Sequence, residues 1–493
     1  MNYPKKICQN AGVVISLLLI LYIQTGCAQS VQQSQSFQYQ TFLSQPELKH
    51  AAAGLIIMDA DTKQTIASYN SEKSLSPASV QKLVTTAYAL EKLGSSYRFQ
   101  TKIYYSGSID TITQILNGNI YVKAGGDPSL GSKYFHKNRA VEEDITQAVR
   151  ELGIKKVNGN IIVDDNIYDT QRAASSWAWQ DIANYYASGA SGFTYKDNLY
   201  ALYFDTRGKV GSKTKLIKQV PKVPGMTFIN EVVSYAGRSD LSYIYGSEYS
   251  NLRYVRGELP AGRKAYKIKG AVPNPPLYFA QTLKLALENK AIKVNGQALH
   301  ERNVDFKNAK ELLVIRSPQL SAIITKTNTH SINLYAEHLL RQPLTVIHKQ
   351  VSAKAAADDM KAYWTAQAVN CEGVEYADGC GLAILGKLTP VHLAELLYFM
   401  RNSSSVSDAF YRSLPVAGKS GTLKYFLDNT SAADKFRLKS GSFTGVRSYA
   451  GYGTTQSGRH IIAVVMVNNY TGKSSAMKNQ MEKLFLSIYT DVK

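Results

Sequence analysis

A Ser-x-x-Lys motif stands at the start of a strongly apolar helical pattern, and this combination constrains the fold more than any other feature. The motif is Ser79-Val80-Gln81-Lys82, and Pro77-Ala78 leads into it. Apolar side chains then recur at helical spacing, at Val80, Leu83, Val84, Ala87, Leu90 and Leu93. Residues three apart share one face of a helix. The sequence therefore predicts a buried helix with Ser79 and Lys82 side by side on its first turn.

This placement suits nucleophilic chemistry. A serine on the first turn lies at the positive end of the helix dipole, but it needs a base to become a nucleophile. A lysine one turn on can be that base if it is desolvated or close to another cation, because either condition lets it lose its proton. Two further matches, Ser212–Lys215 and Ser475–Lys478, are interpreted as solvated surface.

Two later motifs carry compatible groups. Ser331-Ile332-Asn333 opens an amphipathic helical pattern, where the hydroxyl can relay a proton and the amide can hold a lysine or a substrate carbonyl. The alternative is a plain serine N-cap. Lys439-Ser440-Gly441-Ser442 follows a strand-like run. There the lysine supplies a fixed positive charge, and the glycine lets a substrate backbone pair along the strand. The alternative is an edge-strand lysine before a turn.

The ordered set Ser-x-x-Lys, Ser-x-Asn and Lys-Ser-Gly resembles the pattern of penicillin-binding proteins and serine β-lactamases. About 250 residues separate Ser79 from Ser331. With that gap, the chain resembles the class C low-molecular-mass penicillin-binding proteins, the D-alanyl-D-alanine carboxypeptidase/endopeptidases, which carry a large insertion there. The resemblance also rests on Gly125-Gly126-Asp127-Pro128, Val163-Asp164-Asp165, Trp177-Ala178-Trp179, Asp378-Gly379-Cys380-Gly381-Leu382 and Leu414-Pro415-Val416-Ala417-Gly418.

Four positions depart from the family's pattern. Ser440 and Ser442 stand where threonine is usual, which conserves the hydroxyl chemistry. Ile332 stands where aspartate is common, so a charge beside the cleft is lost. Cys380 stands where serine is usual.

The resemblance, together with the order of predicted strands and helices, predicts an α/β (α+β) penicillin-binding/serine β-lactamase-like domain. This domain has an antiparallel sheet, flanking helices and inserted β-rich domains. Residues 46–98 and 303–493 are expected to form the catalytic domain. Residues 99–204 and 271–302 are expected to form the inserted domain, and 205–270 a small nested β-rich module.

The local patterns predict the individual elements. Strands are expected over 54–60, 64–69, 114–122, 159–165, 436–439, 448–454 and 461–468. Helices are expected over 276–289, 320–327, 331–341 and 352–368, after the Thr389-Pro390 cap, and from about Ser475. Because strands lie at both ends with helices between them, the first and last parts of the chain are expected to meet in one domain.

The resemblance implies a mechanism. Ser79 attacks the carbonyl between two D-alanines, or between D-alanine and a cross-linking diamino acid, and Lys82 takes its proton. Ser331, held near Asn333 and Lys439, passes a proton to the leaving amine, and water then releases the acyl-enzyme. β-Lactam antibiotics are expected to acylate Ser79 by the same route.

The resemblance also implies substrate contacts. Asn333, Lys439, Ser440, Gly441 and Ser442 are the expected binding residues, with the N–H groups of Ser79 and Ser442 as the oxyanion hole. Asp164 is expected to meet the amino group of a diamino acid; the alternative is a turn carboxylate. No cofactor or metal is expected, because His-Glu-x-x-His is absent and the eight histidines form no metal-spaced cluster.

The N-terminus predicts export to the periplasmic cell envelope. Lys5 and Lys6 precede an apolar stretch over 11–23, and Thr25-Gly26-Cys27 follows, which is the order of a secretory signal. Residues 1–27 are therefore expected to be a signal of the lipoprotein type, with Cys27 lipidated and inserted in the inner or outer membrane. Because Gln24 departs from the usual aliphatic residue, cleavage after Ala28 is the alternative.

Two features of the mature chain follow from this reading. Residues 28–45, rich in Gln and Ser, are expected to be a tether. In an oxidising compartment Cys371 and Cys380 could form a disulfide or stay as two thiols, and both possibilities are open.

The formal charge of +20 does not indicate nucleic-acid binding, because the positive charges are dispersed and no Lys/Arg block has interleaved aromatics. A generally basic surface, an anionic membrane or an anionic wall polymer accounts for it. The expected partner is the peptidoglycan peptide. Two rival functions are a serine β-lactamase and a non-catalytic, wall-binding lipoprotein.

Overall fold

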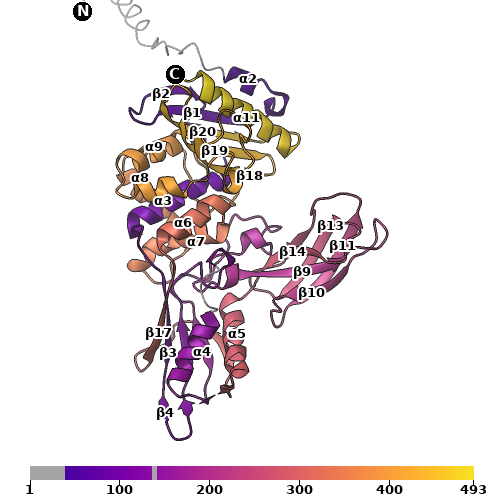
Figure 1. Ribbon diagram of the computed structural model, residues 1–493, viewed down its shortest axis with the longest axis vertical. Coiled ribbons are helices and arrows are strands. Elements are labelled where there is room, and N and C mark those ends of the chain that lie inside the picture. Colours follow the sequence, from indigo (N-terminus) through magenta and orange to yellow (C-terminus); the bar gives the residue numbers. More distant parts are fainter. Residues whose placement is uncertain (1–38, 136–140) are drawn as a thin grey trace, which may run out of the picture.

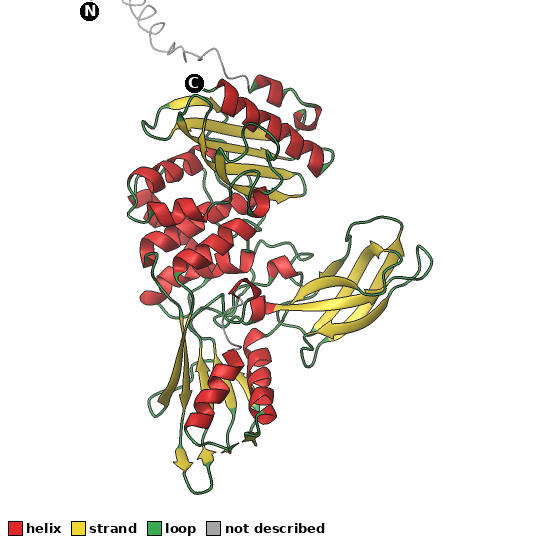
Figure 2. Cartoon of the chain, in the orientation of Figure 1, coloured by secondary structure: helices red, strands yellow, loops and turns green. Residues whose placement is uncertain are grey.

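The computed structural model describes residues 39–493 apart from 136–140. A body of sheet and helices lies at one end of an elongated molecule, an insertion continues it, and an arm projects sideways from the insertion (Figure 1). Figure 2 shows a group of helices lying between the sheet of the body and the strands of the insertion.

The body is built on a five-stranded antiparallel sheet that joins both ends of the chain. Its order is β18-β19-β20-β1-β2. β1 pairs along its whole length with β20, from Ala52 opposite Asn468 to Asp59 opposite Ile461. The first and last parts of the chain therefore meet in one sheet, as predicted. The strands are β1 (Ala52–Asp59), β2 (Thr65–Tyr69), β18 (Phe436–Phe443), β19 (Val446–Thr454) and β20 (His460–Asn468).

Alternation along β1 explains how helices cover both faces of this sheet. Leu55 and Ile57 pack in the core that includes α11 (Ser474–Asp491). Ile56 and Met58 pack in the opposite core, with α3 (Gln81–Leu93) and α9 (Pro390–Asn402). Successive strand residues point to opposite faces, so a strand buried on both sides must be apolar at every position.

The remaining helices of the body pack around α3. Pro390 opens α9 and the Thr389 Oγ accepts a hydrogen bond from the His392 N–H, as the sequence predicted. One predicted boundary is wrong: the helix expected from Ser331 begins at Asn333, because Ser331 has a left-handed φ of +57° at the end of α6. These helices are α6 (Leu320–His330), α7 (Asn333–Arg341), α8 (Ala353–Ala366) and α10 (Ser407–Ser413).

The insertion contains two sheets, ordered β16-β8-β6-β3-β17 and β15-β7-β5-β4. The single strand expected over 114–122 is two strands separated at Gly118, where a side chain would lie 1.8 Å from the Ser106 carbonyl oxygen. The elements are β3 (Gln100–Tyr105), β4 (Ser108–Asp110), β5 (Ile115–Asn117), β6 (Ile120–Lys123), α4 (Val141–Glu151), β7 (Lys156–Val157), β8 (Ile161–Asp164), α5 (Pro275–Asn289), β15 (Lys293–Val294), β16 (Ala298–Glu301) and β17 (Lys310–Arg316).

The arm, residues 199–271, consists of two three-stranded sheets, β10-β9-β14 and β11-β13-β12. Leu202 and Phe204 of one sheet share a core with Val232 and Val255 of the other. The strands are β9 (Leu199–Asp205), β10 (Lys215–Val220), β11 (Thr227–Tyr235), β12 (Tyr243–Tyr245), β13 (Leu252–Pro260) and β14 (Tyr266–Ala271).

Strand pairing suggests one change to the predicted domain boundaries. β17 lies within the predicted catalytic part, 303–493, yet it pairs with β3 of the insertion. We propose that the insertion ends near residue 316, and we keep the other predicted boundaries as proposals.

The predicted tether, 28–45, is too long at its C-terminal end. Gln40–Leu43 form the short helix α2, and Phe42 is buried in the core that includes α11. The apolar Phe42 and Leu43 give this otherwise polar segment an anchor on the body. The predicted signal and Cys27 lie outside the described residues.

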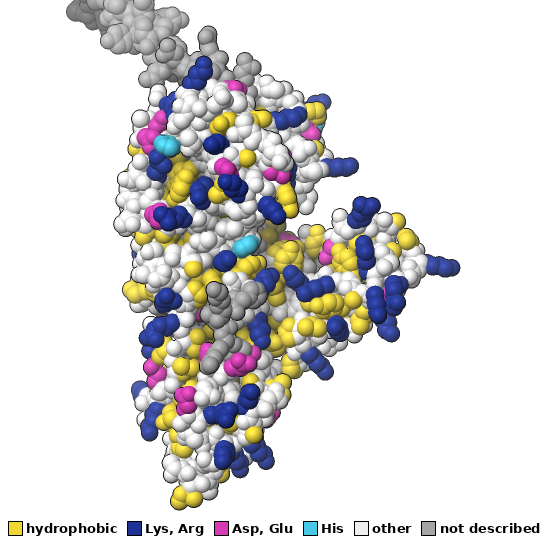
Figure 3. All heavy atoms as spheres, viewed as in Figure 1, with side chains coloured by type: hydrophobic (Ala, Val, Ile, Leu, Met, Phe, Trp, Pro, Cys, Tyr) yellow, Lys and Arg dark blue, Asp and Glu magenta, His cyan; other side chains and the backbone are white. Residues whose placement is uncertain are grey.

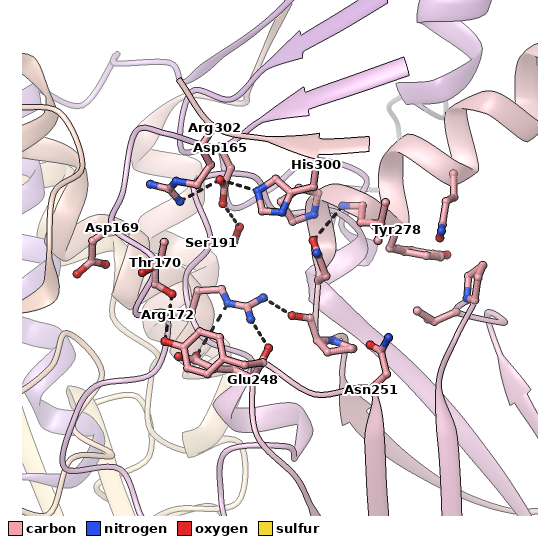
Figure 4. A pocket seen from close by; sticks show the side chains of 18 residues that line it. Asp165, Asp169, Thr170, Arg172, Ser191, Glu248, Asn251, Tyr278, His300 and Arg302 are labelled. Carbon is pink, nitrogen blue, oxygen red and sulfur yellow. Dashed lines mark hydrogen bonds and ion pairs between the residues drawn. The ribbon is translucent and has the colours of Figure 1, made fainter. Parts of the chain in front are cut away.

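Charged side chains lie around a cavity of about 370 Å³ where the arm joins the insertion (Figure 4). The buried Asp165 accepts hydrogen bonds from Arg302 at 3.0 Å and from Ser191 at 2.9 Å, and its Oδ1 lies 2.8 Å from His300 Nε2. Burial alone would raise the pKa of Asp165, but His300 and then Arg302 outweigh burial and hold the pKa below 3.8. Asp165 therefore stabilises the junction as an anion.

We predict that Asp165→Asn lowers the free energy of unfolding by about 3 kcal/mol, because it leaves the partly buried Arg302 guanidinium without its counter-charge and replaces a carboxylate that also contacts His300. Because the folded-state pKa is depressed, the contribution of Asp165 is complete above its unfolded pKa and is lost as pH falls through the folded value. Thermal unfolding at neutral pH and at acid pH measures both effects. Asp408→Asn, which removes an exposed pair with Arg412, should leave the midpoint unchanged.

Candidate active site

Ser79 lies in a short turn, η2 (Ala78–Val80), that leads directly into α3. Ala78 has a left-handed φ of +47°, an unfavourable conformation for a residue with a β-carbon. Gly381 packs so closely on this turn that a side chain there would lie 1.9 Å from the Ala78 carbonyl oxygen. Such strain persists where the surroundings fix the backbone, so the position of Ser79 is tightly determined.

Lys82 lies one turn further along, fully buried behind Ser79. Its Nζ donates hydrogen bonds to Ser79 Oγ at 3.0 Å, to Asn333 Oδ1 at 2.7 Å and to the Cys380 carbonyl oxygen at 2.7 Å. Burial lowers the pKa of Lys82, and the influences of Cys380, Asp378 and Glu337 that raise the pKa are weaker. The environment of Lys82 therefore favours the neutral amine more than water does.

A second buried lysine approaches from β18. Lys439 Nζ donates to Ser331 Oγ at 3.0 Å and to the Ser440 carbonyl oxygen at 2.6 Å. Burial, and after it the charge of Lys82, lower the pKa of Lys439 well below its ordinary value. The structure thus brings Ser79, Lys82, Ser331, Asn333 and Lys439 together.

Alternation along β18 places the rest of the third motif. Gly441 lies against the Ser79 turn: a side chain there would be 2.7 Å from the Pro77 carbonyl oxygen and 3.0 Å from the Ser79 nitrogen. Ser440 points elsewhere and donates to Thr422 Oγ at 2.8 Å. β18 is the edge strand of its sheet. Glycine is therefore required for close approach, and the strand end beside Ser79 can pair with an extended peptide.

A loop around Asp378 carries the carbonyl group that binds Lys82. The Asp378 carboxylate accepts hydrogen bonds from the N–H groups of Gly381, Leu382 and Ala383. It also accepts one from Trp177 Nε1 of the insertion at 2.8 Å. These donors fix the loop, and through the Cys380 carbonyl they fix the orientation of Lys82.

The buried atoms of Glu337, Asp378 and Cys380 lie within 4.8 Å of one another, close enough for a metal site. Glu337, however, accepts from the Gly379 N–H at 2.8 Å and from Arg341 at 3.1 Å. The Asp378 carboxylate is also surrounded by donors. We interpret the cluster as a hydrogen-bonded network that supports the Lys82 loop.

A groove of about 500 Å³ opens beside these groups. Ser79, Ser331, Asn333 and Ser442 line it, while Lys82 and Lys439 are buried behind. The groove is also lined by Ala78, Ala178, Gln180, Asp181, Tyr186, Tyr243, Gly381, Leu382, Ile384, Phe443 and Thr444. A hydroxyl group backed by a buried amine thus faces a space that is large enough for a short peptide.

Asp164 is not among the residues that line this groove. Its carboxylate accepts a hydrogen bond from the Asn166 N–H at 2.9 Å, as expected of a turn carboxylate, and another from the N–H of the distant Val304 at 3.2 Å. Cys371 and Cys380 are both free thiols.

Sequence reasoning missed Asp181, the carboxylate that does line the groove. Its Oδ1 accepts a hydrogen bond from Tyr186, which also lines the groove, at 2.7 Å. Burial raises the pKa of Asp181 above its ordinary value, and the Tyr186 hydrogen bond offsets only part of this increase. In the sequence, Asp181 is marked only by its position two residues after Trp177-Ala178-Trp179, a stretch that supports the family resemblance.

Known proteins resemble this chain over most of its length. The model of the D-Ala-D-Ala carboxypeptidase 3 (S13) family matches residues 36–487. A D-alanyl-D-alanine carboxypeptidase DacB from Haemophilus influenzae is 25% identical over 451 residues, covering 89% of this chain and 91% of that protein. A D-alanyl-D-alanine carboxypeptidase from an Actinomadura species is 26% identical over 449 residues, covering 87% and 79%.

Among solved structures, penicillin binding protein 4 (dacB) from Haemophilus influenzae superposes with a TM-score of 0.78 at 22% identity, over 92% of this chain and 100% of that one. This likeness confirms the predicted fold class. Because the family model spans almost all of the described residues, the chain belongs to the D-Ala-D-Ala carboxypeptidase 3 (S13) family of serine hydrolases and is a class C low-molecular-mass penicillin-binding protein.

Proposed function

We propose that Ser79 is the nucleophile of a serine-type D-alanyl-D-alanine carboxypeptidase/endopeptidase that cleaves peptidoglycan peptides through an acyl-enzyme. The observation that carries this proposal is the 3.0 Å contact between Ser79 Oγ and the buried Lys82 Nζ. A hydroxyl becomes a useful nucleophile only when a base is within hydrogen-bond reach.

Lys82 is the proposed base. As an ammonium it has three protons and three acceptors. Once neutral, it can keep its donations to Asn333 and the Cys380 carbonyl and turn its lone pair toward Ser79. The Ser79 hydroxyl then donates to Lys82. As Oγ bonds to the substrate carbonyl carbon, that proton passes to Nζ.

Ser331 is the proposed route for the proton to the leaving amine. It lies between the groove and Lys439, and Asn333 on the same wall contacts Lys82. When the C–N bond breaks, the released amine is D-alanine in the carboxypeptidase reaction or the cross-linking diamino acid in the endopeptidase reaction. Water then hydrolyses the Ser79 ester.

The oxyanion formed at the substrate carbonyl is proposed to accept hydrogen bonds from the N–H groups of Ser79 and Ser442. The support for this pairing is the close packing of Gly441 on the Ser79 backbone, which brings β18 to the nucleophile. In comparable enzymes such donors contribute about 3–4 kcal/mol each to the transition state.

The terminal carboxylate of the peptide is proposed to lie near Ser442 and Asn333. Lys439 is buried behind Ser331, so we propose that it contributes its charge through that hydroxyl. Ser440 and Gly441 are proposed to contribute backbone groups that pair with the substrate.

For the amino group of a diamino acid, we propose Asp181 in place of Asp164. Asp181 lines the groove that contains Ser79, whereas Asp164 binds two backbone N–H groups of the insertion. A carboxylate in a partly buried wall selects a cationic group.

We also propose that the protein is exported to the periplasmic cell envelope and anchored by lipid at Cys27, on the strength of the N-terminal pattern. Within residues 39–493, apart from 136–140, no helix is both long and apolar enough to cross a bilayer.

We predict that Ser79→Ala lowers D-alanine release from a pentapeptide at least about 10³-fold and abolishes labelling by a fluorescent penicillin. Ser475→Ala, which changes the exposed serine of another Ser-x-x-Lys match, serves as the control and should behave as wild type. A persistent label in Ser79→Ala would contradict the assignment. Rapid release of hydrolysed penicillin from the wild type would instead favour a β-lactamase.

We predict that Lys82→Arg slows acylation about 10²–10⁴-fold, because arginine keeps the charge but does not lose its proton. In the wild type, acylation should rise with pH as Lys82 deprotonates, with a midpoint below the ordinary lysine value of 10.5. The second-order acylation constant measured across about pH 5 to 10 tests both statements. A pH-independent rate would count against Lys82 as the base.

We predict that Asp181→Asn raises KM about tenfold for peptides with a free side-chain amine, through loss of a charge-assisted hydrogen bond. KM for the same peptides with that amine acetylated should not change. Steady-state kinetics on both peptides provide the test, with Asp164→Asn as the comparison. If Asp164→Asn alone gave the selective effect, the result would favour Asp164 as the residue that contacts the side-chain amine.

A further inference from the structure

The positive charge of the chain is concentrated in the arm. Residues 199–271 contain thirteen Lys or Arg and five Asp or Glu, an excess of eight charges out of the chain's twenty. Lys and Arg side chains gather over the arm in Figure 3. This excess of positive charge therefore lies in one continuous stretch of the sequence, and the fold places that stretch in the projecting arm.

Strand register places four of these lysines on one face of the sheet β10-β9-β14. Lys218 of β10 and Lys267 of β14 lie opposite Tyr203 of β9, one on each side. Residues directly opposite in antiparallel strands project to the same face. Both ammonium groups lie over the Tyr203 ring, at 5.0 Å and 5.7 Å from its centre.

The same register adds the other two lysines. Lys215 lies opposite Asp205 and Lys269 opposite Ala201, and both partners share the face of Tyr203. We call Lys215, Lys218, Lys267 and Lys269 the lysine face. The other side of the sheet packs into the arm core through Leu202, Phe204 and Ile268.

The described residues give the lysine face little neutralising charge. Asp205 is bound by Arg207, and no described carboxylate lies within 4.0 Å of the ammonium groups of the lysine face. The pKa of Lys269 is lowered by burial first and then by the neighbouring charges of Lys133 and Lys267, and these outweigh the opposing influence of Asp197. Clustered like charges that repel one another form a surface that attracts an anion.

The lysine face leads toward the active site. The Lys269 ammonium lies 5.8 Å from the centre of the Tyr185 ring. Lys133, Tyr185 and Lys269 line a cavity of about 190 Å³ that also includes Ser331 and Asn333. A polymer bound along the lysine face would therefore reach the residues that line the groove.

We propose that the lysine face binds the carboxylate-bearing peptide stems of a peptidoglycan strand and presents one stem to the groove. The proposal rests on the proposed function for the identity of this polymer, whose uncleaved stems carry free carboxylates. Charge complementarity and continuity with the groove favour this occupant over a lipid surface. Lysine ammoniums suit anions whose spacing varies, because they act as point charges without fixed geometry.

The test compares two double variants with equal charge changes. Lys218→Glu/Lys267→Glu alters the lysine face. Lys293→Glu/Lys310→Glu alters exposed residues on other sheets of the insertion and serves as the control. Co-sedimentation with purified, insoluble peptidoglycan measures binding, and D-alanine release from a soluble pentapeptide measures the active site separately.

We expect the lysine-face variant to bind peptidoglycan about tenfold more weakly than wild type at about 0.05 M NaCl, while the control variant binds as wild type. The difference should shrink at about 0.5 M NaCl, because salt screens exposed charges. Turnover of the soluble pentapeptide and the unfolding midpoint should be unchanged in both variants.

Three results would overturn the proposal: equal binding by all three proteins, an equal loss in the control, or a loss by the lysine-face variant on anionic phospholipid vesicles but not on peptidoglycan. Because sedimentation does not depend on turnover, a wild type that fails to cleave the pentapeptide would contradict the proposed function and leave this test intact.

Discussion

Two buried lysine amines lie in one site, and the rest of the active site depends on that arrangement. Lys82 and Lys439 are both fully buried, and each has only nearby oxygens to satisfy its protons. Burying two full ammonium charges is energetically costly, so the site favours states in which the two amines together carry less than two positive charges. Ser79 and Ser331 contact these amines. The Ser79 hydroxyl can therefore give up a proton, and the Ser331 hydroxyl can pass one on.

The Asp378 loop shows how a carboxylate can act without touching a substrate. The Asp378 carboxylate accepts hydrogen bonds from three backbone N–H groups and from the Trp177 indole. These bonds hold the loop so that the Cys380 carbonyl faces Lys82. Since Cys380 contributes its carbonyl and not its thiol, a cysteine in place of the usual serine leaves this contact intact. Trp177 belongs to the insertion, which thereby helps to position the amine in the body.

Sequence reasoning predicted the fold class and the three stretches that converge, because these depend on residue type and order. It failed where single backbone conformations decide the outcome. The left-handed Ser331 leaves no compositional trace, so α7 was expected two residues early. Asp164 and Asp181 are both carboxylates of the insertion, and only the path of an irregular loop decides which one lines the groove. The lysine face depends on strand register, and an irregularity between Leu216 and Lys218 shifts that register.

The pairing of β1 with β20 has a consequence for synthesis. Lys82 bonds to residues 251 and 298 positions away, and the sheet beneath it closes only with the strand that ends at Asn468. Contacts so distant in sequence form late, after most of the chain entropy has been lost. A growing polypeptide therefore carries Ser79 without a functioning base until the strand that ends at Asn468 has been made. A chain that ends before β20 lacks the strand that pairs with β1, so we expect it to be inactive.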